Sequence, residues 1–353
     1  MRLYQSKLSS RRNRRRHRTL RRLGIGLGLL VVVLSPVIYS YVTAMTKPSS
    51  LPLGIRTVEW IRANGGAGLV SFVEREYYTW TAPSKGGPPL RALPAINGAR
   101  GQTDPKPRST KDPSVPRPPR IQLPIRPHLR GEGIWHPTAD WVSGTPPVMV
   151  AEFRPDPSYP RVVAYVAWMN TKRVQLALYP GRYEPPSSLP RGPMMVPYDQ
   201  RWRLLATFNS GFTYGDGHGG FYTDGHLYTP LVPGKATLLA YRNGQIRIAP
   251  WQGGARPGAS VVLARQNASM IVQNGRLAPN LFNGNQSEWG LTLGNAILVW
   301  RSAVGVDKHG NLIYGAADYR TVGSLAKMML EAGAVQAMNR TIATYWQAAA
   351  AQT

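Results

Sequence analysis

The chain has 353 residues and a formal net charge of +26, and it contains no cysteine, which excludes disulfide bonds, thiolate metal sites and cysteine nucleophiles. Much of the basic excess lies in residues 1–22, which hold ten Lys or Arg residues and no acid, and in residues 82–131. No folded domain is strongly basic as a result, and we expect no nucleic-acid partner.

Residues 23–46 contain no charged side chain and are rich in Leu, Val, Ile and Gly. This run exceeds the ~20 apolar residues that cross a bilayer core of about 30 Å. The basic tail of residues 1–22 is expected to stay in the cytoplasm. The alternative is a cleaved signal peptide, for which residues 42–44 are the nearest cleavage-like site. We favour an uncleaved signal-anchor, that is, a single-pass transmembrane helix in the cell membrane with lipid as a partner and the C-terminal domain outside the cytoplasm.

Two further segments precede the main domain. Residues 47–81 predict short amphipathic helices at 58–62 and 69–75, which lie either at the lipid interface or in a packed stalk. Residues 82–132 are dense in Pro, Gly and basic residues and predict a disordered, polyproline-like linker that buries no core. A plain spacer is the simplest interpretation of this linker, although its charge also suits anionic wall polymer or lipid headgroups.

Residues 133–353 predict one folded domain. Strand-like runs recur at 161–168, 174–179, 236–241 and 270–273. Hairpin turns, which favour residues that tolerate positive φ, are indicated at 224–225, 243–244, 274–275 and 309–310. One helix is predicted from Ser324 to Met338, where apolar residues recur with helical spacing, and Gly333 near its end is a candidate stop. The expected fold class is α+β, a mostly antiparallel sheet domain with one clear C-terminal helix.

The first group of candidate site residues lies between Asn209 and Gly225. A strand is expected to deliver Asn209 to a glycine-rich loop that contains Gly211, Gly219 and Gly220 and ends at Asp224. Glycines permit close approach of backbone N–H groups to a ligand such as a phosphate. The loop lacks the pattern of a nucleotide P-loop, and taken alone it is equally an ordinary surface loop.

The second group comprises Arg301, Asp307, Asp318 and Arg320. An arginine entering a strand can hold a phosphate through paired hydrogen bonds, and aspartates can carry acid–base chemistry. Asp307, which precedes Lys-His-Gly, is most simply a turn residue. Arg301 and Asp318 equally suit a structural ion pair.

The histidines show no spacing typical of a metal site, and the chain lacks the Gly-x-Ser-x-Gly pattern of serine hydrolases. We therefore expect no transition metal and no cofactor, and the sequence leaves calcium open.

Taken in order, these clusters resemble the bacterial phosphodiester glycosidase family, whose animal relative uncovers mannose 6-phosphate on lysosomal proteins. The resemblance covers residues 200–338, and its matching segments are Asn209-Ser-Gly-Phe212, Gly219-Gly-Phe-Tyr-Thr-Asp-Gly225, Arg301-Ser-Ala-Val-Gly305, Asp318, Val322-Gly-Ser-Leu325 and the run Glu331 to Met338. Ser210 and Tyr319 replace family glycines, and Asn339 is followed by Arg340-Thr-Ile-Ala instead of the family's Leu-Asp-Gly-Gly-Gly. We expect either a domain truncated at its C-terminus or a natural short relative that only binds glycan.

The resemblance implies a hydrolase that acts on, or recognises, sugar-1-phosphodiester or exopolysaccharide glycans of the cell envelope. It assigns the phosphate to Arg301, the catalytic carboxylate to Asp318, and further catalytic contacts to Asn209. Substrate contacts are assigned to Gly211, Gly219, Gly220 and Asp224. The implied partner is an envelope polysaccharide or sugar-phosphate polymer, and the alternative is a catalytically inactive envelope-glycan-binding or structural protein.

Overall fold

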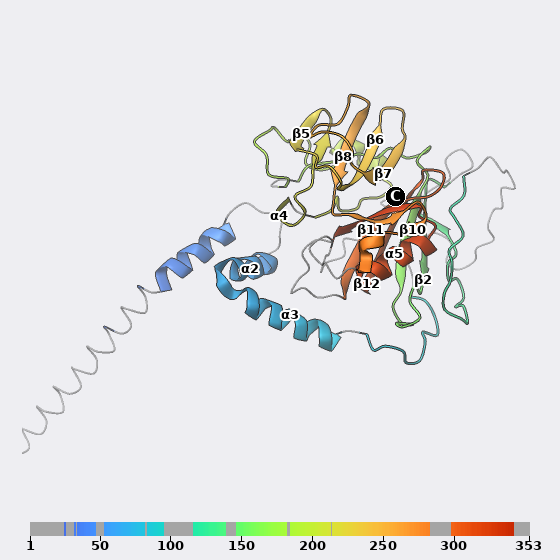
Figure 1. The fold of residues 1–353 in the computed structure, drawn as a ribbon, viewed down its shortest axis with the longest axis horizontal. Coiled ribbons are helices and arrows are strands. Elements are labelled where there is room, and N and C mark those ends of the chain that lie inside the picture. The colour runs from blue at the N-terminus through green and yellow to red at the C-terminus, as the bar shows by residue number, and fades with distance from the viewer. Residues whose placement is uncertain are drawn as a thin grey trace, which may run out of the picture. The chain divides into compact units, whose positions relative to one another are not determined.

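The computed structural model describes residues 25, 32, 34–46, 53–81, 83–94, 116–138, 146–181, 184–212, 214–282 and 298–341. The chain divides into two compact units, Met1–Val70 and Ser71–Thr353. The predicted basic tail lies outside the described residues, as does part of the predicted membrane segment. Figure 1 shows the elements in chain order.

In the first unit, residues 34–46 are helical and pair with α2 (Leu53–Ile61). The rings of Tyr41 and Trp60 meet edge to face with centroids 5.1 Å apart, and Trp60 Nε1 donates a hydrogen bond to Ser40 Oγ at 3.0 Å. An aromatic pair of this geometry adds about 0.5–1.5 kcal/mol beyond area burial. A π-type turn, η1 (Arg62–Gly66), follows α2 and leads into α3 (Ala67–Thr81). The two short helices expected between residues 47 and 81 are therefore present.

Within the part of the chain that the structure describes, no helix combines the length and the apolar character needed to cross a bilayer. The predicted span at 23–46 includes residues 26–31, which lie outside that part.

The second unit contains two antiparallel sheets. The eight-stranded sheet has the order β1-β2-β3-β12-β11-β13-β9-β10. Its strands are β1 (His136–Pro137), β2 (Val148–Phe153), β3 (Ala164–Met169), β9 (Met270–Gln273), β10 (Arg276–Leu277), β11 (Val299–Val306), β12 (Leu312–Arg320) and β13 (Gln336–Thr341). The five-stranded sheet has the order β5-β4-β8-β6-β7. Its strands are β4 (Phe221–Thr223), β5 (His226–Thr229), β6 (Ala236–Tyr241), β7 (Ile246–Pro250) and β8 (Val261–Gln266).

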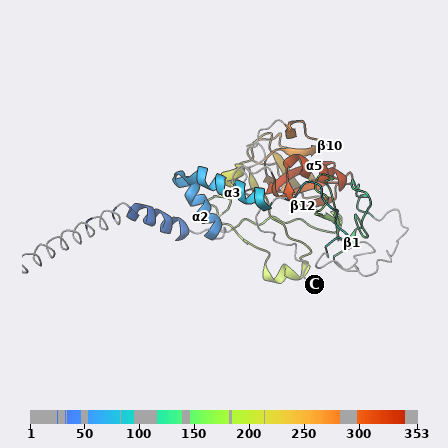
Figure 2. The same ribbon diagram turned by 90° about the horizontal axis from the view of Figure 1, so that it is seen from below.

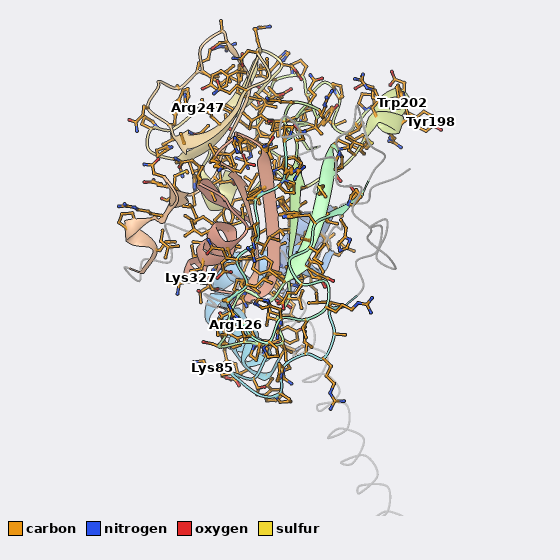
Figure 3. All side chains as sticks on the ribbon, turned by 90° about the vertical axis from the view of Figure 1, so that its right-hand side faces the viewer. Lys85, Arg126, Tyr198, Trp202, Arg247 and Lys327 are labelled. Atoms are coloured by element: carbon orange, nitrogen blue, oxygen red, sulfur yellow. The ribbon has the colours of Figure 1, made fainter. Side chains whose placement is uncertain are left out.

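Short helices complete this unit. They are the 3-10 helices η2 (Tyr198–Arg203) and η3 (Pro279–Phe282), and the α-helices α4 (Tyr214–Gly217) and α5 (Val322–Glu331). Figure 3 shows Tyr198 and Trp202 of η2 pointing away from the sheets, and both side chains are exposed.

Strand periodicity builds two core layers around the large sheet. Ala303 of β11 belongs to the apolar cluster that contains α5, whereas its neighbour Val304 belongs to the cluster shared with the five-stranded sheet. Because successive side chains of a strand point to opposite faces, α5 covers one face of the large sheet and the five-stranded sheet covers part of the other. Figures 1 and 2 show α5 lying beside β12 of the large sheet. The predicted α+β class with a mostly antiparallel sheet is confirmed.

Helix α5 shows how local sequence sets an element's limits. Thr321 caps its start by accepting a hydrogen bond from the backbone N–H of Ser324 at 3.0 Å. The helix ends at Glu331, and Gly333 takes a φ of 93°, which a side chain would disfavour. The prediction of a stop at Gly333 is confirmed. The prediction that the helix reaches Met338 is wrong, because residues 336–341 pair with β11 as β13.

Three other expectations need correction. Residues 174–179 form no strand, and their apolar side chains pack instead beside the cluster between the sheets. No strand delivers Asn209, since residues 204–211 are irregular. Residues 116–132 of the expected linker are packed: Ile121 and Ile125 are buried, and Gln122 N–H donates to Glu331 O at 2.9 Å. Alternating apolar residues in this proline-rich stretch give it a buried face that its composition conceals.

Candidate functional site

The loop that carries Asn209 lies against the end of β8. Asn267, which follows β8, is fully buried; its Oδ1 accepts a hydrogen bond from Phe212 N–H at 3.0 Å, and its Nδ2 donates to Ser210 O at 3.3 Å. Gly211 has a φ of 130°, and a Cβ at this position would overlap the Asn267 amide. The glycine is therefore required by packing. Asn209 itself is exposed.

Gly219 and Gly220 lie against Gln266 at the end of β8. Gln266 Oε1 accepts from Gly220 N–H at 3.0 Å, and Gly220 O accepts from Gln266 N–H at 2.9 Å. Gly219 O accepts from Thr229 Oγ1 at 3.1 Å. Both hydrogen-bonding groups of the Gly220 backbone thus serve the fold in this conformation. The substrate contacts expected of these glycines stay predictions.

Two buried arginines meet beside this loop, one from each sheet. Arg265 of β8 donates through Nη2 to Phe212 O, through Nη1 to Gln266 O, and through Nε to Ser210 Oγ at 3.4 Å. Arg340 of β13 lies with its guanidinium carbon 4.8 Å from the ring centroid of Phe208.

The electrostatics of this pair are unfavourable in the protein alone. The pKa of Arg340 is lowered to about 9, mainly by burial; Tyr314 opposes this effect, and the nearby charge of Arg265 adds to it. Burial also lowers the pKa of Arg265 to about 10, with Glu184 acting in the opposite direction. Both side chains remain cations at neutral pH. In the part of the chain that the structure describes, Nε and Nη1 of Arg340 are buried without a hydrogen-bond acceptor.

Arg340 stands at an irregularity of the large sheet. Ala303 of β11 pairs with Asn339 of β13, but the next residue, Ser302, pairs with Thr341. Arg340 is therefore the extra residue of a β-bulge, a feature that re-aims side chains and recurs next to active sites. Ser302 Oγ is buried and, within the described residues, has no hydrogen-bond partner.

Arg301 lies on the face of the large sheet that packs against α5. It pairs with Ala317, which belongs to the cluster around that helix. Its Nε donates to Arg320 O at 2.9 Å, while Nη1 and Nη2 have no acceptor among the described residues. Burial lowers the pKa of Arg301 to about 10. The phosphate contact predicted for Arg301 would have to be made in this enclosed position.

Asp318 lines an open cleft of about 530 Å³. Tyr165 and Trp300 lie in the same lining, and the segment from Leu90 to Pro94 forms part of another wall. Arg301 is not among the lining residues. The structure thus gives Asp318 a cavity and aromatic neighbours, but it does not bring Asp318, Arg301 and Asn209 together in one cleft.

Glu152 of β2 is a buried acid that the sequence analysis did not single out. It pairs across the sheet with Tyr165, and its Oε2 has no partner among the described residues. Burial raises the pKa of Glu152 to about 7. The signal available in the sequence was an acid inside the alternating run Val148–Phe153, where the same face is otherwise apolar.

Two remaining aspartates are turn residues. Asp224 and Gly225 take φ values of 48° and 80° at the tip of the β4–β5 hairpin, as predicted for this pair. Asp307 is buried; its Oδ1 accepts from His309 N–H at 2.8 Å, and its Oδ2 accepts from Trp168 Nε1 at 3.0 Å. The turn role predicted for Asp307 is confirmed.

Among the described residues, no group of three or more His, Asp or Glu side chains is arranged to hold a metal ion. The positions that carry the unusual chemistry are instead basic and buried. Arg265 and Arg340 were missed because each is the single charged residue of its strand, and only the packing of the two sheets brings them together.

Comparison with known proteins finds a match in the second half of the chain. The family model for phosphodiester glycosidases matches residues 203–339. No curated protein matches the sequence.

Three solved structures are similar to part of this chain. The catalytic domain of zebrafish N-acetylglucosamine-1-phosphodiester alpha-N-acetylglucosaminidase, auto-inhibited by its pro-peptide, is 18% identical, with a TM-score of 0.41 over 58% of this chain and 74% of that one. A hypothetical protein from Synechocystis is 13% identical, with a TM-score of 0.35 over 57% of each chain. An exported protein from Burkholderia pseudomallei is 12% identical, with a TM-score of 0.34 over 53% of this chain and 69% of that one.

The matched range begins at Arg203 and ends at Asn339, so it contains the Asn209 loop, β8, Arg301 and Asp318. Residues 203–339 of this chain are therefore similar to the phosphodiester glycosidase domain.

Proposed function

We propose that this protein is a membrane-anchored extracytoplasmic hydrolase that cleaves the bond between a sugar anomeric carbon and a phosphodiester in an envelope glycopolymer or exopolysaccharide. The observation that carries the proposal is the cleft in which Asp318, a residue of the family domain, lies with the aromatic side chains Tyr165 and Trp300. Aromatic rings offer apolar faces for a sugar ring, and a carboxylate beside them can face the anomeric carbon.

The chemistry requires little from a general acid. The phosphate monoester that leaves has a second pKa near 6, so it departs as a stable anion at neutral pH. The carboxylate of Asp318 would then stabilise, or attack, the positively charged anomeric centre. Asn209, exposed on its loop, would hydrogen-bond the substrate.

The test uses the full chain purified in detergent and a methyl phosphodiester of N-acetylglucosamine 1-phosphate, because the zebrafish enzyme is named for that bond. Release of the free sugar is measured. We expect Asp318→Asn to lower the rate by about 10² or more, the range over which acid–base groups contribute. Asp199→Asn, the same change at an exposed position on η2, should leave the rate unchanged. An Asp318→Asn protein of full activity would overturn the assignment.

Binding without hydrolysis is the second candidate. It is favoured by the resemblance, because Arg340 and Thr341 follow Asn339 instead of the Leu-Asp expected there. In that case the full chain would bind the same compound in calorimetry but release no sugar.

The anchor is tested separately by fractionating cells that express the full chain. We expect it to stay with membranes after a carbonate wash and to keep residues 1–46, as read by N-terminal sequencing. A mature N-terminus near Met45 would show cleavage and overturn the signal-anchor.

A further inference from the structure

Arg265 and Arg340 form a buried cationic pair that no acid among the described residues neutralises through an ion pair. The acid that acts on Arg265 is Glu184, and the group that acts favourably on Arg340 is the Tyr314 phenol. Neither arginine forms an ion pair among the described residues; Glu132–Arg154 and Asp156–Arg320 are the pairs present there.

Local contacts do not offset this burial. The contact of Arg340 with Phe208 is a cation–π interaction, and such an interaction is worth about 2 kcal/mol when it is desolvated. Removing an unpaired ion from water costs several kcal/mol even after the protein relaxes. The remaining deficit, together with the Arg340 donors that lack an acceptor, indicates that an anion belongs at this position.

The sheet supplies a second unsatisfied donor on the same side. Ser302 alternates with Val304, which belongs to the cluster between the two sheets, and Arg340 contacts Phe208, which packs against that cluster. Ser302 also pairs with Thr341, the residue next to Arg340. The hydroxyl of Ser302 and the guanidinium of Arg340 thus lie on one face of adjacent strands.

We propose that Arg340 and Ser302, with the fixed charge of Arg265 across from them, bind the phosphate group of a sugar phosphodiester. The phosphate identity rests on the proposed function, whereas the anion site rests on the two arginines. Ser210, whose Oγ accepts from Arg265 Nε, is half-buried, and the neighbouring Asn209 is exposed.

In the resemblance described above, leucine is expected after the asparagine that corresponds to Asn339, and the Arg340 guanidinium departs from that pattern. The site also moves the phosphate contact away from Arg301, which faces α5.

The test measures the thermal unfolding of the purified full chain in detergent against increasing inorganic phosphate, with sodium chloride at matched ionic strength as the reference. A ligand that binds the folded state raises the melting temperature in a saturable way. Arg340→Leu, which restores the family residue, is expected to weaken apparent phosphate affinity by at least about tenfold, because hydrogen bonds to a charged group are lost. Ser302→Ala should weaken it less.

The matched control is Arg247→Gln, which removes one positive charge from an exposed position on β7 (Figure 3). It should keep the phosphate response of the parent protein. If Arg340→Leu fails to fold, judged by circular dichroism, Arg340→Lys and Ser302→Ala carry the test, and both should weaken the response. A saturable response that is undiminished in these variants, or no response in the parent protein beyond that of chloride, would overturn the site.

The same variants separate this site from the hydrolase proposal. Phosphate binding that depends on Arg340, in a protein that releases no sugar from the phosphodiester, supports the site and removes the hydrolase function. Sugar release that is unchanged in Arg340→Leu, together with unchanged phosphate binding, removes the site and keeps the function. The phosphodiester can also bind where free phosphate does not, because the sugar contributes to its affinity. In that case the proposal requires that Arg340→Leu weaken binding of the phosphodiester. Unchanged binding of the phosphodiester would overturn the site.

Discussion

Two buried arginines of this domain, Arg154 and Arg340, differ in what surrounds them. Arg154 donates through Nε and Nη2 to the two carboxylate oxygens of Glu132, at 2.9 and 2.8 Å, and to Pro127 O at 2.8 Å. Arg340 is equally buried, but its near neighbours are an aromatic ring and the like charge of Arg265. The fold supplies the counter-charge in the first region and leaves it to a ligand in the second.

In the first region, the contacts of Glu132 with Arg154 lower the pKa of the acid. Burial acts to raise the pKa of Glu132, but hydrogen bonds from the Arg154 side chain and from the backbone N–H groups of Leu129 and Arg154 outweigh it, so the pKa lies below its usual value. No comparable group is directed at Arg340 among the described residues. Equal burial of the same residue type therefore marks a structural brace in one region and a binding group in the other.

The largest effect should follow from removing the Glu132–Arg154 ion pair. Glu132→Gln leaves Arg154 buried without a counter-charge, and removing one partner of a buried pair costs about 3–5 kcal/mol of unfolding free energy. Urea denaturation at pH 7 measures this loss.

The matched double variant Glu132→Gln/Arg154→Met removes the stranded charge. It should recover part of the lost stability, because the methionine can fill the space without charge. A single Glu132→Gln variant as stable as the parent would show that Arg154 does not depend on this acid.

A change of opposite sign is expected in the second region. Arg340→Leu removes a buried unpaired cation, and in phosphate-free buffer it should raise the unfolding free energy by about 2–3 kcal/mol. Denaturation without phosphate and with saturating phosphate measures the unfolding free energy of both proteins. The difference in favour of Arg340→Leu should shrink when phosphate binds and stabilises the parent protein. A variant that is less stable than the parent in phosphate-free buffer would show that the cation is already compensated.

Glu152 is the acidic counterpart of Arg340, a buried ionisable group that has no partner of opposite sign among the described residues. Its folded pKa of about 7 exceeds an unfolded value of about 4.3, so the folded state binds more protons between these pH values. Stability should therefore fall as pH rises from about 4.3 to about 7.

Glu152→Gln should remove that fall and stabilise the protein by about 1–2 kcal/mol at pH 8, with no gain at pH 4. Denaturation of both proteins across this pH range gives the difference. An equal gain at both pH values would locate the effect in packing instead of ionisation.

The sequence anticipated the parts of the fold that depend on neighbouring residues. Asn274-Gly275 and Asp224-Gly225 form the predicted tight turns because both residues of each pair take positive φ, which their side chains tolerate. Helix α5 was recognised from its apolar spacing, and its end at Gly333 from the glycine. These features depend on residues close together in the sequence, so they can be predicted without knowledge of the tertiary structure.

The candidate site was less predictable because its geometry is non-local. The sequence analysis placed Arg301 and Asp318 in one candidate group, yet Arg301 faces α5 and Asp318 lines a cleft. Arg340 comes next to Arg265 through a β-bulge in one sheet and the packing of another. Neither arrangement produces a periodic pattern of residues in the sequence from which it could be predicted.

The smallest effect should come from an intermediate case, the pair of Arg320 and Asp156. Arg320 Nη1 lies 3.3 Å from Asp156 Oδ2, and Asp156 is partly exposed. Glu331 is close enough to act on Arg320, and its pKa is raised to about 8 by burial, with the charge of Asp156 contributing and that of Arg320 opposing.

Asp156→Asn removes one acid, but it also removes a repulsion that adds to the effect of burial on the pKa of Glu331. Glu331 then ionises more readily and replaces part of the lost charge, so the cost should be about 1 kcal/mol, far below that of Glu132→Gln. Urea denaturation at pH 7 gives the comparison, and Asp156→Asn/Glu331→Gln is the control that removes the substitute. If that double variant costs no more than Asp156→Asn alone, Arg320 is not neutralised by either acid, and it belongs with Arg340 instead of Arg154.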